Sequence, residues 1–72
     1  MKKIKKIKIK VNGKVKTFKE NINLSRLVKN LKIPIKKVAI ELNQEIIDKK
    51  KINKIMLRNN DSIEIVHFIG GG

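Results

Sequence analysis

Cysteine is absent from the chain, which excludes disulfide bonds and thiolate metal sites and fits a reducing compartment. Tryptophan and tyrosine are absent too, so Phe18 and Phe68 are the only large aromatic side chains. No uninterrupted apolar run exceeds three residues, so the sequence predicts neither a transmembrane span nor a signal-peptide core. These absences predict a cytoplasmic protein without a membrane partner.

The side chains that usually carry catalysis are also scarce. The one histidine, His67, stands near the end of a predicted strand, where a lone histidine is more often structural than catalytic. The six carboxylates are scattered through turns and polar strand faces. A chain of 72 residues buries only about 60% of its unfolded surface, which leaves no room for a deep pocket. We therefore predict a protein that is not an enzyme, with no catalytic residues, no metal and no bound cofactor.

Positive charge is abundant, with 19 basic residues and a net charge of +13. This charge favours a polyanionic partner, and a basic nucleic-acid-binding module is the alternative function of a different class. Only Arg26 and Arg58 are arginines, however, and few aromatic rings are available to stack on bases. Lysine, isoleucine and asparagine make up more than half of the chain, which is typical of an AT-rich genome. We expect no specific nucleic-acid binding.

The segment 7–18 predicts a β-hairpin, because apolar residues alternate with lysine and Asn12-Gly13 is a strong turn signal. A two-residue turn places lysines opposite Val11 and Ile9. A three-residue loop places Val15 and Thr17 there instead, and we favour it because it keeps one face apolar. In an alternative interpretation, residues 1–11 form a basic amphipathic helix on a membrane surface.

One amphipathic helix is predicted after the hairpin. Its apolar stripe has the spacing i, i+3, i+4 and i+7 and consists of Leu24, Leu27, Val28 and Leu31. Asn23 is the expected N-cap, and Pro34 marks the end.

Strand periodicity returns in residues 38–42, near Ile46 and Ile47, briefly near 56–57, and finally in 62–69. In the last strand Ile63 and Ile65 point toward the core, whereas Val66 and Phe68 point the other way. Apolar residues on both sides indicate a central strand, and the helix is long enough as a crossover to pair it in parallel with the first. The prediction is an α+β fold of the β-grasp type, a mixed four- to five-stranded sheet with one main helix packed on one face.

Three of the four glycines are Gly70, Gly71 and Gly72, directly after an apolar strand. Without Cβ atoms this segment can enter a narrow channel of a partner. It delivers the Gly72 carboxylate, which is ionised at neutral pH and can attack the α-phosphate of ATP. We predict a β-grasp domain in residues 1–69 and a flexible reactive tail in 70–72, with Gly70, Gly71, Val66 and Phe68 contacting the partner.

The stretches "VAIELNQEII" and "NDSIEIVHFIGGG" closely resemble the sulfur carrier of thiamine biosynthesis, a ubiquitin-like β-grasp protein. The "NLSRLV" helix start and the "VNGK" turn also fit. The resemblance implies that an E1-like adenylating enzyme uses ATP to activate Gly72. A sulfur donor, such as a cysteine desulfurase or a rhodanese-type protein, then gives a thiocarboxylate, and thiazole synthase takes its sulfur.

Two related families share this terminal chemistry. The small subunit of molybdopterin synthase typically has a proline before its glycines, which "IVHFIGGG" lacks. A ubiquitin-like modifier would transfer the activated glycine to an amine. The glycines alone do not separate these three functions.

Overall fold

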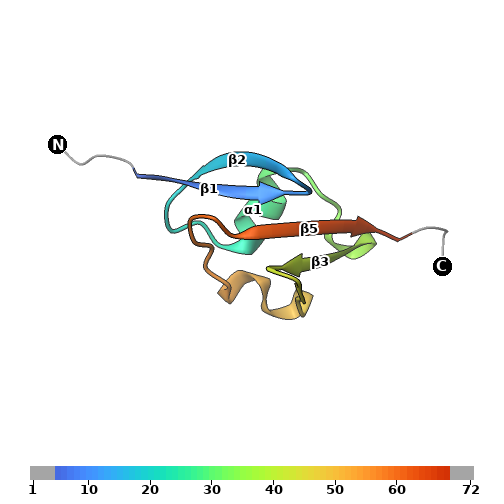
Figure 1. Cartoon of the computed structure of the whole chain (residues 1–72). Coiled ribbons are helices and arrows are strands. Elements are labelled where there is room, and N and C mark those ends of the chain that lie inside the picture. Colours follow the sequence, from blue (N-terminus) through green and yellow to red (C-terminus); the bar gives the residue numbers. More distant parts are fainter. Residues whose placement is uncertain (1–4, 69–72) are drawn as a thin grey trace.

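The computed structural model describes residues 5–68 of the chain. Five strands, one α-helix and two short 3₁₀ helices follow one another in this part (Figure 1). In chain order they are β1 (Lys6–Val11), β2 (Lys14–Lys19), α1 (Leu24–Asn30), η1 (Ile35–Lys37), β3 (Val38–Leu42), β4 (Glu45–Ile46), η2 (Lys49–Lys54) and β5 (Ser62–His67).

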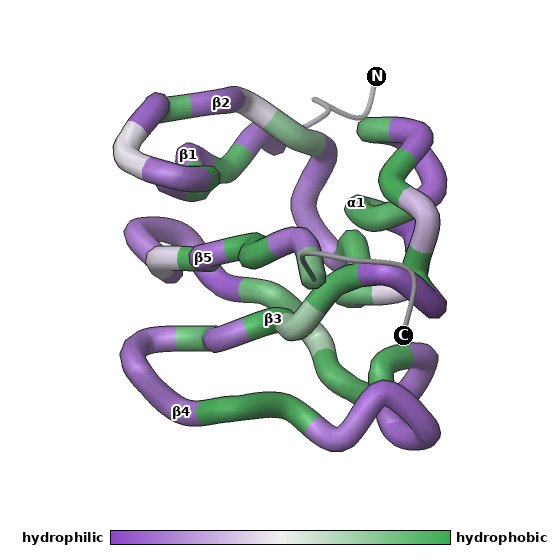
Figure 2. The backbone as a smooth tube through the Cα atoms, turned by 90° about the vertical axis from the view of Figure 1, so that its right-hand side faces the viewer, coloured by the Kyte–Doolittle hydropathy of each residue, from purple (hydrophilic) through white to green (hydrophobic). Residues whose placement is uncertain are grey.

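The strands form one mixed sheet in the order β2-β1-β5-β3-β4. Strands β1 and β5 pair in parallel, and the other neighbours pair antiparallel. Helix α1 lies against one face of the sheet, and no helix of residues 5–68 lies on the opposite face (Figure 2). The predicted α+β class, the β-grasp arrangement and the central position of the last strand are confirmed.

The hydrophobic core fills the space between the sheet and α1. Alternate side chains along β1 and β5 point inward, and most of these are apolar. The apolar stripe of α1 packs against them from the other side. The buried members are Ile9, Val11, Ile22, Leu24, Leu27, Val28, Val38, Ile40, Leu57, Ile63 and Ile65. Full burial of one such side chain stabilises the fold by about 1.5–3 kcal/mol, so this small set carries most of the stability.

Helix α1 begins where the sequence predicts. The Oδ1 atom of Asn23 accepts a hydrogen bond from the Arg26 N–H at 2.7 Å, which satisfies one of the free donors of the first turn. The helix ends at Asn30, and Lys32 then adopts a left-handed conformation with φ of 56°. Pro34 follows shortly after, as expected for a residue that cannot continue a helix.

The favoured register of the first hairpin is wrong. Val11 pairs with Lys14 across a two-residue turn. Asn12 and Gly13 both have positive φ, 50° and 83°, which is the type I′ conformation that matches the twist of a hairpin. Strand β2 lies at the sheet edge, and most of its residues are exposed. Its lysines therefore stay in water whichever face they occupy, so the hairpin does not need a register that keeps one face apolar.

Two other segments refine the sequence predictions. Residues 6–11 form a strand, which rules out a membrane-surface helix over them. The brief strand expected near 56–57 is reduced to a single bridge between Met56 and Asn23. Before it, η2 supplies the short helical crossing. Within residues 5–68, no helix combines the length and apolar character needed to cross a membrane.

Candidate functional site

The end of β5 is the part of the described chain that leads toward the predicted reactive tail. Ile63 and Ile65 are buried, whereas Val66 and Phe68 are 52% and 59% exposed. The predicted facing of these side chains is therefore confirmed. Their contact with a partner stays a prediction, and Gly70, Gly71 and Gly72 lie outside the described residues.

Val66 stands on the sheet face that α1 leaves uncovered, which we call the open face. It pairs with Ala39 of β3, and the next pair of the two strands on the same face is Glu64 with Glu41. Glu41 in turn pairs with Ile46 of β4, whose side chain is 80% exposed. Apolar side chains thus flank two directly opposed carboxylates, next to the strand that runs to the C-terminus.

Phe68, just beyond β5, contacts residues of the two 3₁₀ helices, η1 and η2. Its backbone N–H donates to the Lys37 carbonyl at 2.9 Å. The Lys49 ammonium lies 5.3 Å from the centre of its ring and donates hydrogen bonds to the carbonyls of Ile35 (3.1 Å) and Val38 (2.9 Å). Val66 and Phe68, which the sequence grouped together, therefore have different surroundings.

The side chains that most often bind metals are spread apart within residues 5–68. His67 is exposed at the end of β5. Residues 5–68 contain no group of three or more His, Cys, Asp or Glu side chains placed to hold a metal ion.

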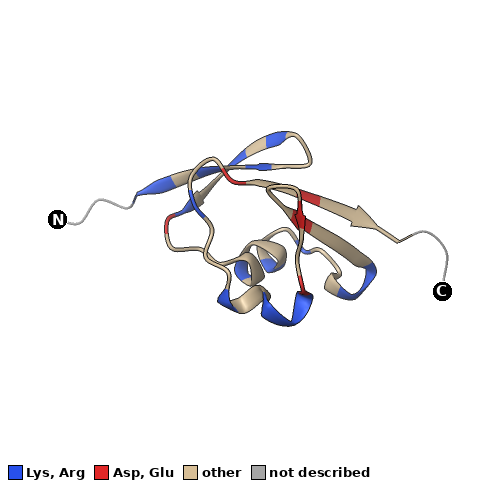
Figure 3. Cartoon of the chain, turned by 60° about the horizontal axis from the view of Figure 1, so that its bottom comes forward, with Lys and Arg blue, Asp and Glu red and all other residues tan. Residues whose placement is uncertain are grey.

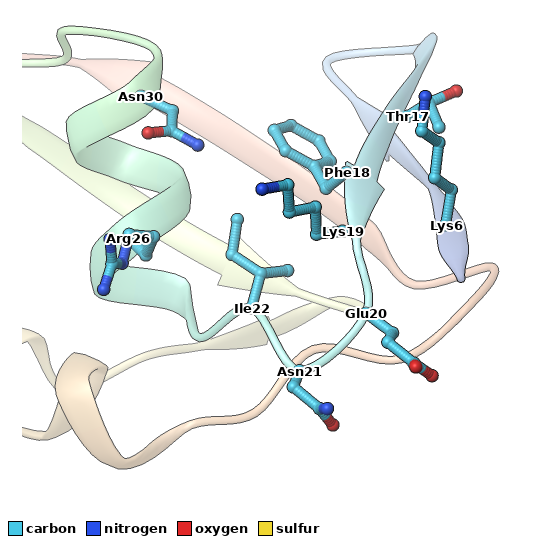
Figure 4. Close-up of a pocket in the computed structure, with 9 residues that line it drawn as sticks. All are labelled: Lys6, Thr17, Phe18, Lys19, Glu20, Asn21, Ile22, Arg26 and Asn30. Atoms are coloured by element: carbon cyan, nitrogen blue, oxygen red, sulfur yellow. The ribbon is translucent and has the colours of Figure 1, made fainter. Parts of the chain in front are cut away.

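A cavity of about 580 Å³ opens between the end of β2 and α1 (Figure 4). Its lining includes three basic side chains, but they do not converge. Arg26 projects from the helix, whereas Lys6 lies beyond β2 on the far side of the Phe18 ring (Figure 4). This arrangement does not form a focused anion site, and it belongs to the opposite end of the strands from the C-terminus (Figure 1).

The basic residues are distributed over strands, helix α1 and the 3₁₀ helices (Figure 3). Strand β1 aligns three of them on one face, because Lys6, Lys8 and Lys10 alternate with its inward-pointing side chains and are exposed. Such a short row of lysines attracts phosphates without reading bases. The predicted absence of specific nucleic-acid binding stays a prediction.

Comparison with known proteins decides the family. The model of the ThiS family matches residues 9–72. The chain belongs to the ThiS family. The sulfur carrier protein ThiS of Bacillus subtilis is 40% identical over 65 residues, which cover 89% of this chain and 98% of that protein. The crystal structure of the thiamine biosynthesis protein ThiS from Geobacter metallireducens superimposes with a TM-score of 0.81 at 30% identity, covering 92% of this chain and 100% of that one.

Thiazole synthases are a second group of relatives. That of Paramagnetospirillum magneticum is 35% identical over 66 residues, which are 92% of this chain but only 20% of the enzyme. The chain thus spans about a fifth of the length of the thiazole synthases that it matches.

The family assignment confirms the resemblance to the sulfur carrier of thiamine biosynthesis and favours it over the small subunit of molybdopterin synthase. It also agrees with the expectation that the chain is not itself an enzyme, because the ThiS relative of nearly equal length is a carrier protein.

Sequence reasoning missed two residues that shape this region. Asn12 was expected only to form a turn, yet its side chain also bonds to β5. Lys49 begins a run of three lysines, and nothing in that run distinguishes it from its neighbours.

Proposed function

We propose that this protein is the sulfur carrier of thiamine biosynthesis and that Gly72 is its reacting residue. The observation that carries the proposal is the ThiS family match, which continues through residue 72. The fold supports it, because the central strand β5 leads directly to the glycines. In this proposal residues 70–72 form the flexible tail that enters a partner's active site.

The chemistry starts at the Gly72 carboxylate, whose reference pKa of about 3.5 keeps it ionised at neutral pH. It attacks the α-phosphate of ATP and displaces pyrophosphate, which gives an acyl-adenylate. A sulfide-level nucleophile then attacks the acyl carbon and displaces AMP, leaving a C-terminal thiocarboxylate. The carrier supplies only the carboxylate, so an E1-like adenylating enzyme binds the ATP. A cysteine desulfurase or a rhodanese-type protein is the expected sulfur donor; because such proteins carry sulfur as a persulfide, a thiol reductant must release it at the level of sulfide.

Thiazole synthase is the proposed sulfur acceptor. In two thiazole synthases, a segment similar to this chain accounts for 20% of the polypeptide. Such a combination of carrier and enzyme in one chain is expected when the two act together. The ATP-dependent step and the absence of cysteine from the carrier support a cytoplasmic location.

The test is a reconstitution with purified carrier, a ThiS-activating enzyme, ATP and sulfide. We expect release of AMP and a carrier whose mass has increased by the difference between one sulfur and one oxygen atom. Transfer to lysine-containing proteins instead would indicate a ubiquitin-like modifier, and an unchanged carrier without AMP would contradict the proposal.

A further inference from the structure

We infer that Lys49 is a positioning residue that fixes where the chain leaves the sheet, so that Gly72 reaches a partner's active site at little entropic cost. This inference rests on the proposed function of Gly72. Among residues 5–68, Lys49 is the only lysine whose ammonium donates hydrogen bonds, and it is half-buried, unlike Lys50 and Lys51.

The position of Lys49 follows from a gap along the edge of β3. Strand β4 covers only one end of that edge, because it consists of Glu45–Ile46. The Ile47 N–H continues the pairing by donating to the Ile40 carbonyl at 2.9 Å. The next carbonyl on the same edge belongs to Val38, and the Lys49 ammonium takes the place of a strand donor there. A hydrogen bond from a charged donor is stronger than one from a neutral donor.

The same ammonium is linked to the end of β5. Val38 is the β3 residue paired with His67, so Lys49 sits beside the last pair of the sheet. The Lys49 ammonium also lies over the Phe68 ring at 5.3 Å, within the range of a cation–π interaction. The Phe68 N–H donates a hydrogen bond to the Lys37 carbonyl, so η1 fixes the backbone of Phe68 while Lys49 contacts its ring.

Holding Phe68 matters because Gly72 is four residues further along the chain, a reach of at most about 14 Å. If Phe68 is released, the partner must order an additional residue when the carrier docks. Ordering one residue costs enough to change an equilibrium constant by about 5- to 30-fold. The cost arises on docking, so it raises KM for the carrier and leaves kcat close to the wild-type value.

The experiment compares Lys49→Met, which keeps an apolar stem of similar length, with Lys50→Met and Lys51→Met. All three variants lose one charge from the same 3₁₀ helix. AMP formation is measured against carrier concentration, and hydrogen exchange of the Phe68 amide is measured on the free protein. We expect Lys49→Met to raise KM about 5- to 30-fold and to accelerate the exchange. Lys49→Arg retains charged donors, so its KM and its exchange rate should stay close to the wild-type values.

Two outcomes would overturn the role of Lys49: an unchanged KM in Lys49→Met, or an equal rise in Lys50→Met, which would indicate net charge alone. Lys49→Gln serves as the second variant if Lys49→Met does not fold. A wild-type carrier that forms no AMP would contradict the proposed function, whereas a normal wild-type rate with an unaffected Lys49→Met contradicts only the role of Lys49.

Discussion

Asn12 and Ile65, 53 residues apart, are joined by two side-chain to backbone hydrogen bonds. The Ile65 N–H donates to Asn12 Oδ1 at 2.7 Å, and Asn12 Nδ2 donates to the Ile65 carbonyl at 3.2 Å. The Asn12 N–H also donates to the Ile63 carbonyl at 2.9 Å. The amide side chain thus continues the parallel pairing of β1 with β5 beyond the point where β1 turns into the hairpin. The first hairpin is thereby attached to the strand that leads to Gly72.

We predict that Asn12→Gly lowers the free energy of unfolding by about 1–3 kcal/mol, because it leaves both backbone groups of Ile65 without a partner. Glycine tolerates the positive φ of this position, so the decrease in the free energy of unfolding measures the contribution of the Asn12 side-chain amide. Urea denaturation is the measurement. Asn21→Gly is the control, since Asn21 has φ of 65° and its side chain has no hydrogen bond within residues 5–68. Equal effects of the two changes would contradict the prediction.

The paired carboxylates of Glu41 and Glu64 should weaken the sheet. Like charges directly opposite each other are destabilising, so Glu64→Gln should raise the free energy of unfolding by about 0.2–1 kcal/mol at low salt. Glu45→Gln makes the same change of net charge at a position paired with Leu42 and controls for the overall charge of the chain. The difference between the variants should shrink as salt screens the repulsion. A destabilised Glu64→Gln relative to Glu45→Gln would show that the two carboxylates do not repel each other in the folded protein.

Val66→Lys should leave the fold intact and weaken the complex with the activating enzyme. Val66 is half exposed, so its replacement should change the free energy of unfolding by no more than about 0.5 kcal/mol. At an interface centre, a buried charge without a partner should reduce affinity about tenfold or more. Val15→Lys is the matched control, because Val15 is similarly exposed but lies on the edge strand β2. Unfolding of Val66→Lys, or binding equal to that of Val15→Lys, would show that Val66 does not face the partner.

Binding to DNA or RNA should be weak, independent of sequence and steeply dependent on salt. The net charge of +13 attracts phosphates, but Arg26 and Arg58 are the only arginines available for bidentate contacts with bases. Fluorescence anisotropy with several unrelated duplexes and single strands, at low and physiological salt, is the measurement. A single sequence bound tightly at physiological salt would contradict this prediction.

The order of strands and the helix were predictable because each rests on local periodicity. Ile63 and Ile65 alternate with Glu64 and Val66, and this pattern alone identified both the buried face and the exposed one. The turn at Asn12-Gly13 was recognised, but its register was not, because the edge strand β2 needs no apolar face.

The role of Lys49 was not predictable from the sequence. It depends on how far β4 extends along β3, and a two-residue strand leaves no reliable signal in the sequence. The same holds for the bonds from Asn12 to Ile65, since a contact over 53 residues arises only from the assembled sheet.

The central claim is that Gly72 is the only reacting group of the chain. The direct measurement is fragment mass spectrometry after incubation with the activating enzyme, ATP and sulfide, applied to the wild-type chain and to a chain without Gly72. We expect the sulfur on the C-terminal residue of the wild type and none on the shortened chain. Deletion shortens the reach by roughly 3.5 Å, and a misplacement of about 1 Å already costs about 100-fold in rate. A shortened chain that still acquires sulfur at the wild-type rate, or a wild-type chain with sulfur elsewhere, would contradict the account.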